Sequence, residues 1–149
     1  IRMKAAIADA TACIGAILGG GSFDEIEALG RYGRALGILA TIRDEFIDTF
    51  EPDELKNRAE SECLPLPILY AFRDQKAKKK IIHLLKKREL KEEDALDVVG
   101  TAMETGQIKA LKKEIQRFLK SGSTPLSAIK NRAIVNELQR ILYATVEDL

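Results

Sequence analysis

The longest helical pattern in this chain lies at residues 22–50, which read SFDEIEALGRYGRALGILATIRDEFIDTF. No proline interrupts this stretch before Pro52, so one helix can continue through all of it. Within it, Gly33 and Gly37 stand about one turn apart, and each costs about 1 kcal/mol of helix stability relative to alanine. A helix that merely faces solvent has no use for two such residues. We therefore expect another element to pack closely against them.

The rest of the chain also reads as helices. Apolar residues recur at helical spacing over residues 3–18, and three glycines, Gly19–Gly21, then end that helix. Ser22, followed three residues later by Glu25, predicts a capping box at the start of the next helix. Further helices are expected at residues 53–59, 66–73, 74–88, 91–103 and 107–120. No stretch alternates apolar and polar β-branched residues between turns, so the predicted fold class is all-α.

The clearest loop is predicted at residues 121–123, which read Ser-Gly-Ser. Thr124 followed by Pro125 is typical of a helix start, because threonine caps the first turn and proline fits the first helical position. The last helix is expected to run from there nearly to the end of the chain.

Length, composition and charge exclude several classes of protein. A chain of 149 residues, 46% of them apolar, can bury one ordinary core, so we expect one domain and place no boundary. The net charge of +1 provides no overall field to attract nucleic acid or an anionic membrane. No apolar run approaches the ~18 residues that a membrane span needs, and no signal-peptide pattern opens the chain.

Two further expectations follow, one from the two cysteines and one from the first residue. Cys13 and Cys63 match neither a metal-ligand spacing nor a disulfide scaffold, so we expect reduced thiols in a soluble cytoplasmic protein. Ile1 already stands inside a helical pattern without a cap. We therefore expect further residues upstream of it.

Three acidic residues, Asp44, Glu45 and Asp48, interrupt an otherwise apolar helical stretch at residues 36–48, which reads LGILATIRDEFID. Asp44 and Asp48 are four residues apart, which places both carboxylates on one face of a helix beside Glu45. Two carboxylates in this arrangement repel each other unless water screens them or a cation lies between them. Mg²⁺ is a hard cation that accepts such oxygens. From the spacing alone, a solvated helix face and a metal site both remain open.

Four short segments resemble one enzyme family, the trans-prenyl diphosphate synthases. Residues 32–37, YGRALG, followed by residues 44–48, DEFID, look like the sequence that leads into the family's second aspartate-rich motif. Upstream, residues 15–20, GAILGG, resemble a helix end of that family, and downstream, residues 66–71, LPILYA, resemble its LPLIYA-like segment. The matches keep the family's order over the first half of the chain, whereas the lysine-rich remainder matches only as a run of helices.

The resemblance implies an isoprenoid-synthase-type helical bundle around a central cavity. There, two aspartate-rich motifs would face each other across an allylic prenyl diphosphate held by Mg²⁺. The implied activity is prenyl transfer, in which the diphosphate leaves, isopentenyl diphosphate attacks the allylic cation and a proton is lost.

The resemblance also implies how much of the enzyme is present. Residues 1–149 would be the C-terminal half of a prenyl diphosphate synthase domain, since the first aspartate-rich motif is absent from these residues. We expect the N-terminal half on the same chain or on another, and a homodimer or heterodimer. This chain alone would be an incomplete enzyme.

The resemblance assigns roles to five residues but names no catalytic residue. Asp44 matches the leading aspartate and principal metal ligand, while Glu45 and Asp48 match the second and last acids of the motif. Lys4 matches a diphosphate-binding lysine, and Lys56 is matched to the lysine that follows the second motif. A compact ammonium group suits a diphosphate, although exposed lysines are common in any sequence.

Three positions depart from the family pattern. Ala5 stands in place of threonine, Thr41 in place of glutamine, and Cys63 in place of a lysine. These departures leave a second hypothesis open, in which the chain is a non-catalytic helical partner or a regulatory subunit of a prenyl diphosphate synthase or of another protein.

Three other features of the sequence are not interpreted as catalytic or ligand-binding sites. His83, the one histidine, has no nucleophile or metal-ligand pattern beside it, so we interpret it as structural or superficial. The lysines of residues 76–80 lack interleaved aromatic residues for base stacking, which favours a solvated helix face. Gly19–Gly21 lacks the Gly-Lys-Ser/Thr that continues a phosphate-binding loop.

Overall fold

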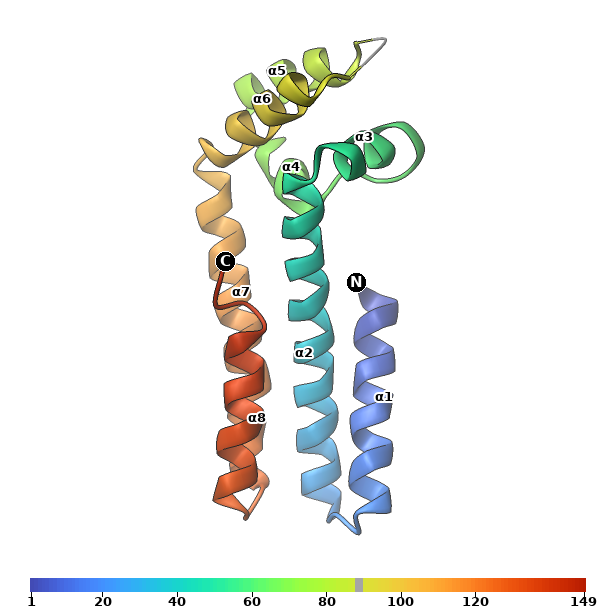
Figure 1. The fold of residues 1–149 in the computed structure, drawn as a ribbon. Helices are drawn as coiled ribbons and strands as arrows, with labels where there is room; N and C mark the ends of the chain where they lie inside the picture. Colours follow the sequence, from blue (N-terminus) through green and yellow to red (C-terminus); the bar gives the residue numbers. More distant parts are fainter. Residues whose placement is uncertain (88–89) are drawn as a thin grey trace. The chain divides into compact units, whose positions relative to one another are not determined.

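The computed structural model describes residues 1–87 and 90–149, and helices make up nearly all of its regular structure (Figure 1). The elements are α1 (Arg2–Leu18), α2 (Phe23–Phe50), α3 (Pro52–Ser61), α4 (Leu66–Ala71), α5 (Gln75–Leu85), α6 (Glu92–Met103), α7 (Gln107–Ser123), the 3₁₀ helix η1 (Thr124–Ala128) and α8 (Arg132–Ala144). No strand occurs among these residues, so the all-α prediction is confirmed. No described helix is both long enough and apolar enough to cross a membrane.

The described helices divide between two compact units. One comprises residues 1–43 and 114–149, and the other comprises residues 44–113. The unit boundaries fall inside α2 and inside α7, so each of these helices contributes to both units.

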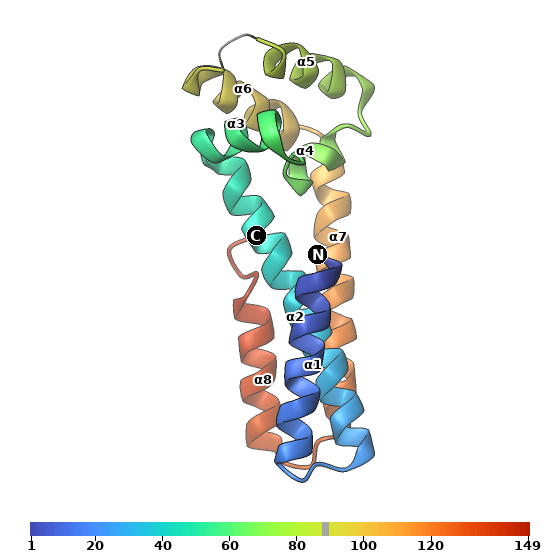
Figure 2. The ribbon, with the colours of Figure 1, turned by 90° about the vertical axis from the view of Figure 1, so that its right-hand side faces the viewer.

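Within the first unit, α1 lies directly against α2, as both views show (Figures 1 and 2). A Cβ atom on Gly33 would lie 2.5 Å from the carbonyl oxygen of Ala8, and one on Gly37 would lie 3.0 Å from the Cα atom of Ala5. The two backbones approach closely because neither glycine carries a side chain. The expected packing against Gly33 and Gly37 is therefore confirmed.

The connection from α1 to α2 follows its sequence signals. Helix α1 ends at Leu18, and Gly20 adopts a φ of 72°, which is the left-handed region that favours glycine. The Ser22 amide donates to the Glu25 carboxylate at 2.9 Å, and the Glu25 amide donates to the Ser22 hydroxyl at 3.4 Å. The predicted capping box is thus present.

The predicted loop at residues 121–123 and the predicted cap at Thr124 are wrong. Helix α7 continues through Ser123, because Gly122 serves close packing rather than a turn. A Cβ atom there would lie 2.7 Å from the Cβ atom of Ala35 and 3.0 Å from the side chain of Leu142. The cap of the last helix is Asn131, whose side chain accepts from two amides of α8 at 3.1 and 3.3 Å.

The second unit has its own apolar core, built by α3, α4, α5 and α6. Its fully buried members include Leu55, Ile68, Ile81 and Val98, one from each helix. At the start of α5, the Asp74 side chain caps the helix by accepting from the amides two and three residues later. This unit carries the acidic motif at the end of α2.

Candidate functional site

The three acidic residues lie in the last two turns of α2 and differ in exposure. Asp44 is exposed, whereas the side chains of Glu45 and Asp48 are only 19% and 29% exposed. The helix ends at Phe50, just before Pro52 begins α3, so all three carboxylates stand close to the turn between the two helices. Their neighbours therefore come from α3 and from the segment that follows it.

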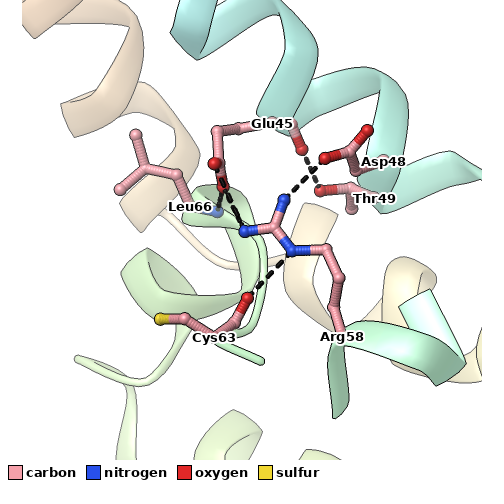
Figure 3. Close-up of polar contacts among 6 residues, drawn as sticks. All are labelled: Glu45, Asp48, Thr49, Arg58, Cys63 and Leu66. Atoms are coloured by element: carbon pink, nitrogen blue, oxygen red, sulfur yellow. Dashed lines mark hydrogen bonds and ion pairs between the residues drawn. The ribbon is translucent and has the colours of Figure 1, made fainter. Parts of the chain in front are cut away.

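A buried arginine, Arg58 of α3, binds two of the three acids (Figure 3). Its side chain is 10% exposed, and its Nη1 atom donates to Asp48 Oδ2 at 2.6 Å. Its Nη2 atom donates to Glu45 Oε2 at 3.1 Å and to Oε1 at 3.3 Å. Its Nε atom donates to the carbonyl oxygen of Cys63 at 2.9 Å. All three nitrogens of the guanidinium group are therefore engaged.

Glu45 has a second set of partners besides Arg58. Its Oε2 atom also accepts from the amide of Leu66, the first residue of α4, at 2.8 Å. Its carbonyl oxygen accepts from the hydroxyl of Thr49, which is fully buried, at 2.7 Å. Together, the bonds of Arg58 and Glu45 join the end of α2 to α3, to the segment at residues 62–65 and to α4 (Figure 3).

The charge of Arg58 is held in place by the two acids. Burial opposes the charged form of the guanidinium, but the charges of Glu45 and Asp48 and the hydrogen bonds to them outweigh it, and they hold the pKa of Arg58 above its usual value. An arginine paired in this way stays ionised at any working pH, so it keeps its positive charge beside both carboxylates.

Sequence reasoning missed Arg58, although one signal was available. Leu55 and Arg58 are three residues apart on α3, which places them on the same face of that helix, and Leu55 is fully buried. A basic residue on a buried face needs an acidic partner. Several acids lie near Arg58 along the chain, among them Glu54 and Glu62 at four residues' distance, so the sequence did not single out those of the motif as its partners.

The arrangement limits how a metal ion can fit. No group of three histidine, cysteine, aspartate or glutamate side chains gathers to hold a metal among residues 1–87 and 90–149. Mg²⁺ is typically held by one or two carboxylates, with waters and substrate phosphates completing its octahedron. The exposed Asp44 fits that pattern as a single carboxylate. The trio as a closed three-ligand cage does not.

The two predicted lysines belong to different units. Lys4 is exposed near the start of α1, in the first unit. Lys56 lies on α3, in the second unit, and lines a small pocket of about 250 Å³. The other lining residues of that pocket are Pro52, Asp53, Leu90, Lys91 and Glu92.

Two of the three departures from the family pattern, Ala5 and Thr41, have structural roles. Ala5 is 1% exposed and lies against Gly37, where the two helices touch. Thr41 is buried and donates its hydroxyl hydrogen bond to the carbonyl oxygen of Gly37 at 2.7 Å. Cys63 is exposed and carries a free thiol. Only its backbone carbonyl oxygen takes part in the site, where it accepts from Arg58.

The segment YGRALG also has a packing role in the first unit. The Tyr32 hydroxyl donates to the carbonyl oxygen of Leu138 on α8 at 3.0 Å. Arg34 pairs with Asp9 on α1 at 2.7 Å. This segment therefore links α2 to the helices on both sides of it.

The fold belongs to a known class of helical enzymes. A geranylgeranyl pyrophosphate synthase from Corynebacterium glutamicum superposes with a TM-score of 0.84 at 23% identity, over 97% of this chain and 45% of that chain. A decaprenyl diphosphate synthase from Rhodobacter capsulatus gives a TM-score of 0.77 at 22% identity, over 97% of this chain and 46% of that chain. The chain therefore has the all-helical isoprenyl diphosphate synthase fold.

Similar sequences come from the same group of enzymes. Geranylgeranyl pyrophosphate synthase 12 of Arabidopsis thaliana is 37% identical over 71 residues, which is 47% of this chain and 20% of that protein. Geranylgeranyl diphosphate synthase of Methanosarcina mazei is 29% identical over 127 residues, which is 82% of this chain and 38% of that protein. No model of a protein family matches the chain.

In sequence and in fold, the chain is similar to the C-terminal part of the trans-isoprenyl diphosphate synthases. The chain spans well under half the length of these relatives in sequence, and slightly less than half of the structural neighbours.

Proposed function

We propose that this chain is the C-terminal half of a prenyl diphosphate synthase domain that condenses isopentenyl diphosphate with an allylic prenyl diphosphate. One observation carries the proposal: an exposed aspartate, Asp44, stands near the end of α2 in a chain with the prenyl synthase fold and with sequence similarity to geranylgeranyl diphosphate synthases.

In this proposal, Asp44 is the principal ligand of Mg²⁺, and Glu45 and Asp48 complete the acidic motif. The metal supplies electrostatic stabilisation of the departing diphosphate. Lys4 and Lys56 supply ammonium groups that bind diphosphate oxygens. Support for a divalent metal comes from one structural neighbour, a geranylgeranyl pyrophosphate synthase whose crystals contain calcium and isoprenyl diphosphate.

The remaining half of the site comes from elsewhere in this proposal. The N-terminal half, with the first aspartate-rich motif, is supplied by the same chain or by another one, in a homodimer or heterodimer located in the cytoplasm. One similar protein is named as the large subunit of a heterodimeric geranylgeranyl pyrophosphate synthase, and it is 37% identical over 93 residues, which is 62% of this chain and 23% of that protein.

The test replaces single acids in the complete protein and measures incorporation of labelled isopentenyl diphosphate. Asp44→Asn keeps the shape of the side chain and removes its charge, so it should lower kcat by about 100-fold or more, as expected when a metal loses its main carboxylate. Asp97→Asn, at an exposed position of α6, is the matched control and should leave kcat nearly unchanged. Equal effects at the two positions would show that the motif match is accidental.

A second candidate is a non-catalytic partner or regulatory subunit. It is favoured by the ion pairs of Glu45 and Asp48 with Arg58, which give two acids of the motif a structural partner within the chain. In that case Asp44→Asn would leave synthesis unchanged, whereas deletion of this chain from a complex with its synthase would alter the synthase's rate.

A further inference from the structure

Helix α5 carries a stripe of lysines on the side that faces away from the core of the second unit. Its buried residues are Ala77, Ile81 and Leu84. The other side carries four exposed lysines, which we call the α5 lysines: Lys76, Lys79, Lys80 and Lys86. Their helical spacing gathers them on one side of the helix, along a rise of about 15 Å.

The α5 lysines have no acidic partner in the parts of the chain that the structure describes. Asp74, which caps the start of the helix, accepts instead from two backbone amides. Exposed cations on other helices, such as Arg31 and Arg140, do pair with an acid of their own helix. Lysines three or four residues apart on a helix repel each other, so the stripe by itself destabilises α5.

Positive charge is concentrated around α5 even though the chain as a whole is nearly neutral. Residues 73–87 contain seven lysines and arginines and one acid, whereas the whole chain has a net charge of +1. The remaining residues are therefore net acidic. Because salt screens charges over about 10 Å, an anionic surface close to α5 responds to this local excess rather than to the average.

The form of the stripe favours an extended anionic surface over one small ligand. A single phosphate group is much shorter than the stripe, and lysine attracts anions as a hydrated point charge without the fixed fork of arginine. Helix α5 also contains no phenylalanine, tyrosine or tryptophan on which the bases of single-stranded nucleic acid could stack.

Apolar and aromatic side chains lie just before the stripe, at the junction of α4 and α5. Leu69 is 38% exposed, and the guanidinium carbon of Arg73 lies 4.2 Å from the centre of the partly exposed Tyr70 ring. The Lys78 ammonium group lies 5.8 Å from the centre of the Phe72 ring. Tyrosine is favoured at membrane surfaces, where one end of the side chain is apolar and the other is wet, and basic residues there attract anionic headgroups.

We propose that the α5 lysines dock the protein reversibly on an anionic phospholipid surface, with the α4–α5 junction beside them among the headgroups. Each lysine near such a surface strengthens binding about fivefold, so the four together strengthen it by on the order of several-hundred-fold. The apolar side of α5 is buried in the protein core and cannot insert into lipid, so the contact is electrostatic and salt releases it.

Membrane docking needs no catalysis. It would place a prenyl synthase beside the phase that takes up amphiphilic prenyl products, and that consequence alone rests on the proposed function.

The test is co-sedimentation of the complete protein with phosphatidylcholine vesicles that contain about one-third phosphatidylserine. The unsubstituted protein should bind at about 0.05 M NaCl, be released at about 0.5 M, and ignore vesicles of phosphatidylcholine alone. Changing all four α5 lysines to glutamine should weaken binding about 100-fold or more. Tm should stay nearly unchanged, because glutamine and lysine have similar helix propensities. Changing all four to arginine keeps the charge and should keep the affinity within about threefold.

Helix α7 offers a matched control. It also carries four exposed lysines without an ion pair in the described part of the chain: Lys109, Lys112, Lys113 and Lys120. Changing these four to glutamine removes the same net charge from another helix. No large apolar side chain of α7 is exposed as Leu69 is beside α5, so this variant should keep vesicle affinity within about threefold.

The outcomes separate membrane docking from its alternatives. Equal losses in the α5 and α7 variants would show that vesicles respond to total charge, and would overturn the assignment to α5. So would a lack of binding at low salt, or binding that salt does not reverse. If duplex DNA or polyglutamate bound through the α5 lysines while the vesicles did not, another polyanion would be the partner and the proposal would fail.

Two further measurements keep the test decisive. If the four-glutamine variant of α5 did not fold, the double variant Lys79→Gln and Lys80→Gln should still weaken vesicle binding about tenfold or more. Incorporation of labelled isopentenyl diphosphate without vesicles tests the proposed function separately, and kcat should not change in the α5 variants, because the proposed site contains none of these lysines.

Discussion

Because Gly33 has a hydrogen atom in place of a side chain, α1 and α2 can pack closely at this position. Its position on α2 lies against the backbone of α1, where an added Cβ atom would be 2.5 Å from the carbonyl oxygen of Ala8. A backbone atom cannot move aside as a flexible side chain can. Gly100, on α6, is the opposite case, because it is exposed and nothing lies within 4 Å of an added Cβ atom.

We predict opposite effects of alanine at these two glycines. Gly33→Ala should lower the free energy of unfolding by about 1–3 kcal/mol, since overpacking against α1 outweighs the gain in helix propensity. Gly100→Ala should raise it by about 0.5–1 kcal/mol, since only the propensity changes. Urea unfolding followed by far-ultraviolet circular dichroism measures both. A stabilising Gly33→Ala would contradict the packing of α1 on α2.

At the scale of elements, the ends of the helices are held by different kinds of cap. Asn131 caps α8 through its side chain, whereas Thr124 begins a 3₁₀ helix whose N-cap, Ser123, makes no side-chain cap hydrogen bond. Asp94 caps the start of α6, where its side chain accepts from the Lys91 amide at 3.2 Å and from the ammonium group of Lys87.

Removing the two candidate caps at the C-terminal end should give unequal losses. Asn131→Ala should lower the free energy of unfolding by about 1 kcal/mol, because two amides of the first turn lose their acceptor. Thr124→Ala should change it by less than about 0.5 kcal/mol, as is usual for an exposed surface position. Chemical unfolding of the two variants decides the point, and a larger loss at Thr124 would restore the prediction made from sequence.

Asp94 should make stability depend on pH in the acidic range. The hydrogen bonds from Lys87 and from the Lys91 amide lower the pKa of this carboxyl group below its usual value. Because the folded-state pKa lies below the unfolded value of about 3.9, the contribution is fully present above that pH and is lost as the pH falls through the folded-state pKa.

We therefore expect Asp94→Asn to be less stable than the unsubstituted protein at pH 7, and the difference to shrink as the pH falls below about 4. Asp97→Asn, at an exposed position on the same helix, is the control and should show no such trend. Thermal unfolding over a range of pH measures both variants. A difference for Asp94→Asn that stays constant down to the most acidic pH would contradict the assigned hydrogen bonds.

At the scale of the whole molecule, each of the two compact units carries residues that the proposed function uses. Residues 44–113 carry the acidic motif with Lys56, and residues 1–43 and 114–149 carry Lys4. The proposed reaction needs metal ions held between two acidic faces, and the proposal assigns one of them to the acids at positions 44, 45 and 48.

The proposed function therefore predicts that the 149-residue chain alone does not synthesise prenyl diphosphate, and that adding the N-terminal half of the domain restores synthesis. Without the second acidic face, the diphosphate is held on one side only and the allylic cation is open to water. Incorporation of labelled isopentenyl diphosphate, with and without the added half, measures this. Robust synthesis by the short chain that depends on Asp44 would overturn the half-site proposal.

The sequence alone determined the features that have local causes. The all-α class, the helix end at Gly19–Gly21 and the capping box of Ser22 with Glu25 each depend on residues within a few positions of one another. The glycines at positions 33 and 37 predicted a close contact in the same way, because their cost in a helix is a local property. The order of the short motifs also sufficed to recognise the prenyl synthase relationship.

Tertiary structure alone decided which distant residues meet. Gly122 looked like part of a loop because its packing partners, Ala35 and Leu142, lie far from it in the chain. The acids at positions 45 and 48 looked equivalent to Asp44 for a related reason, since Arg58 reaches them only after a turn brings α3 back against α2. Spacing along a helix reports which side chains share a face, but which of them are desolvated and paired depends on the element that packs there.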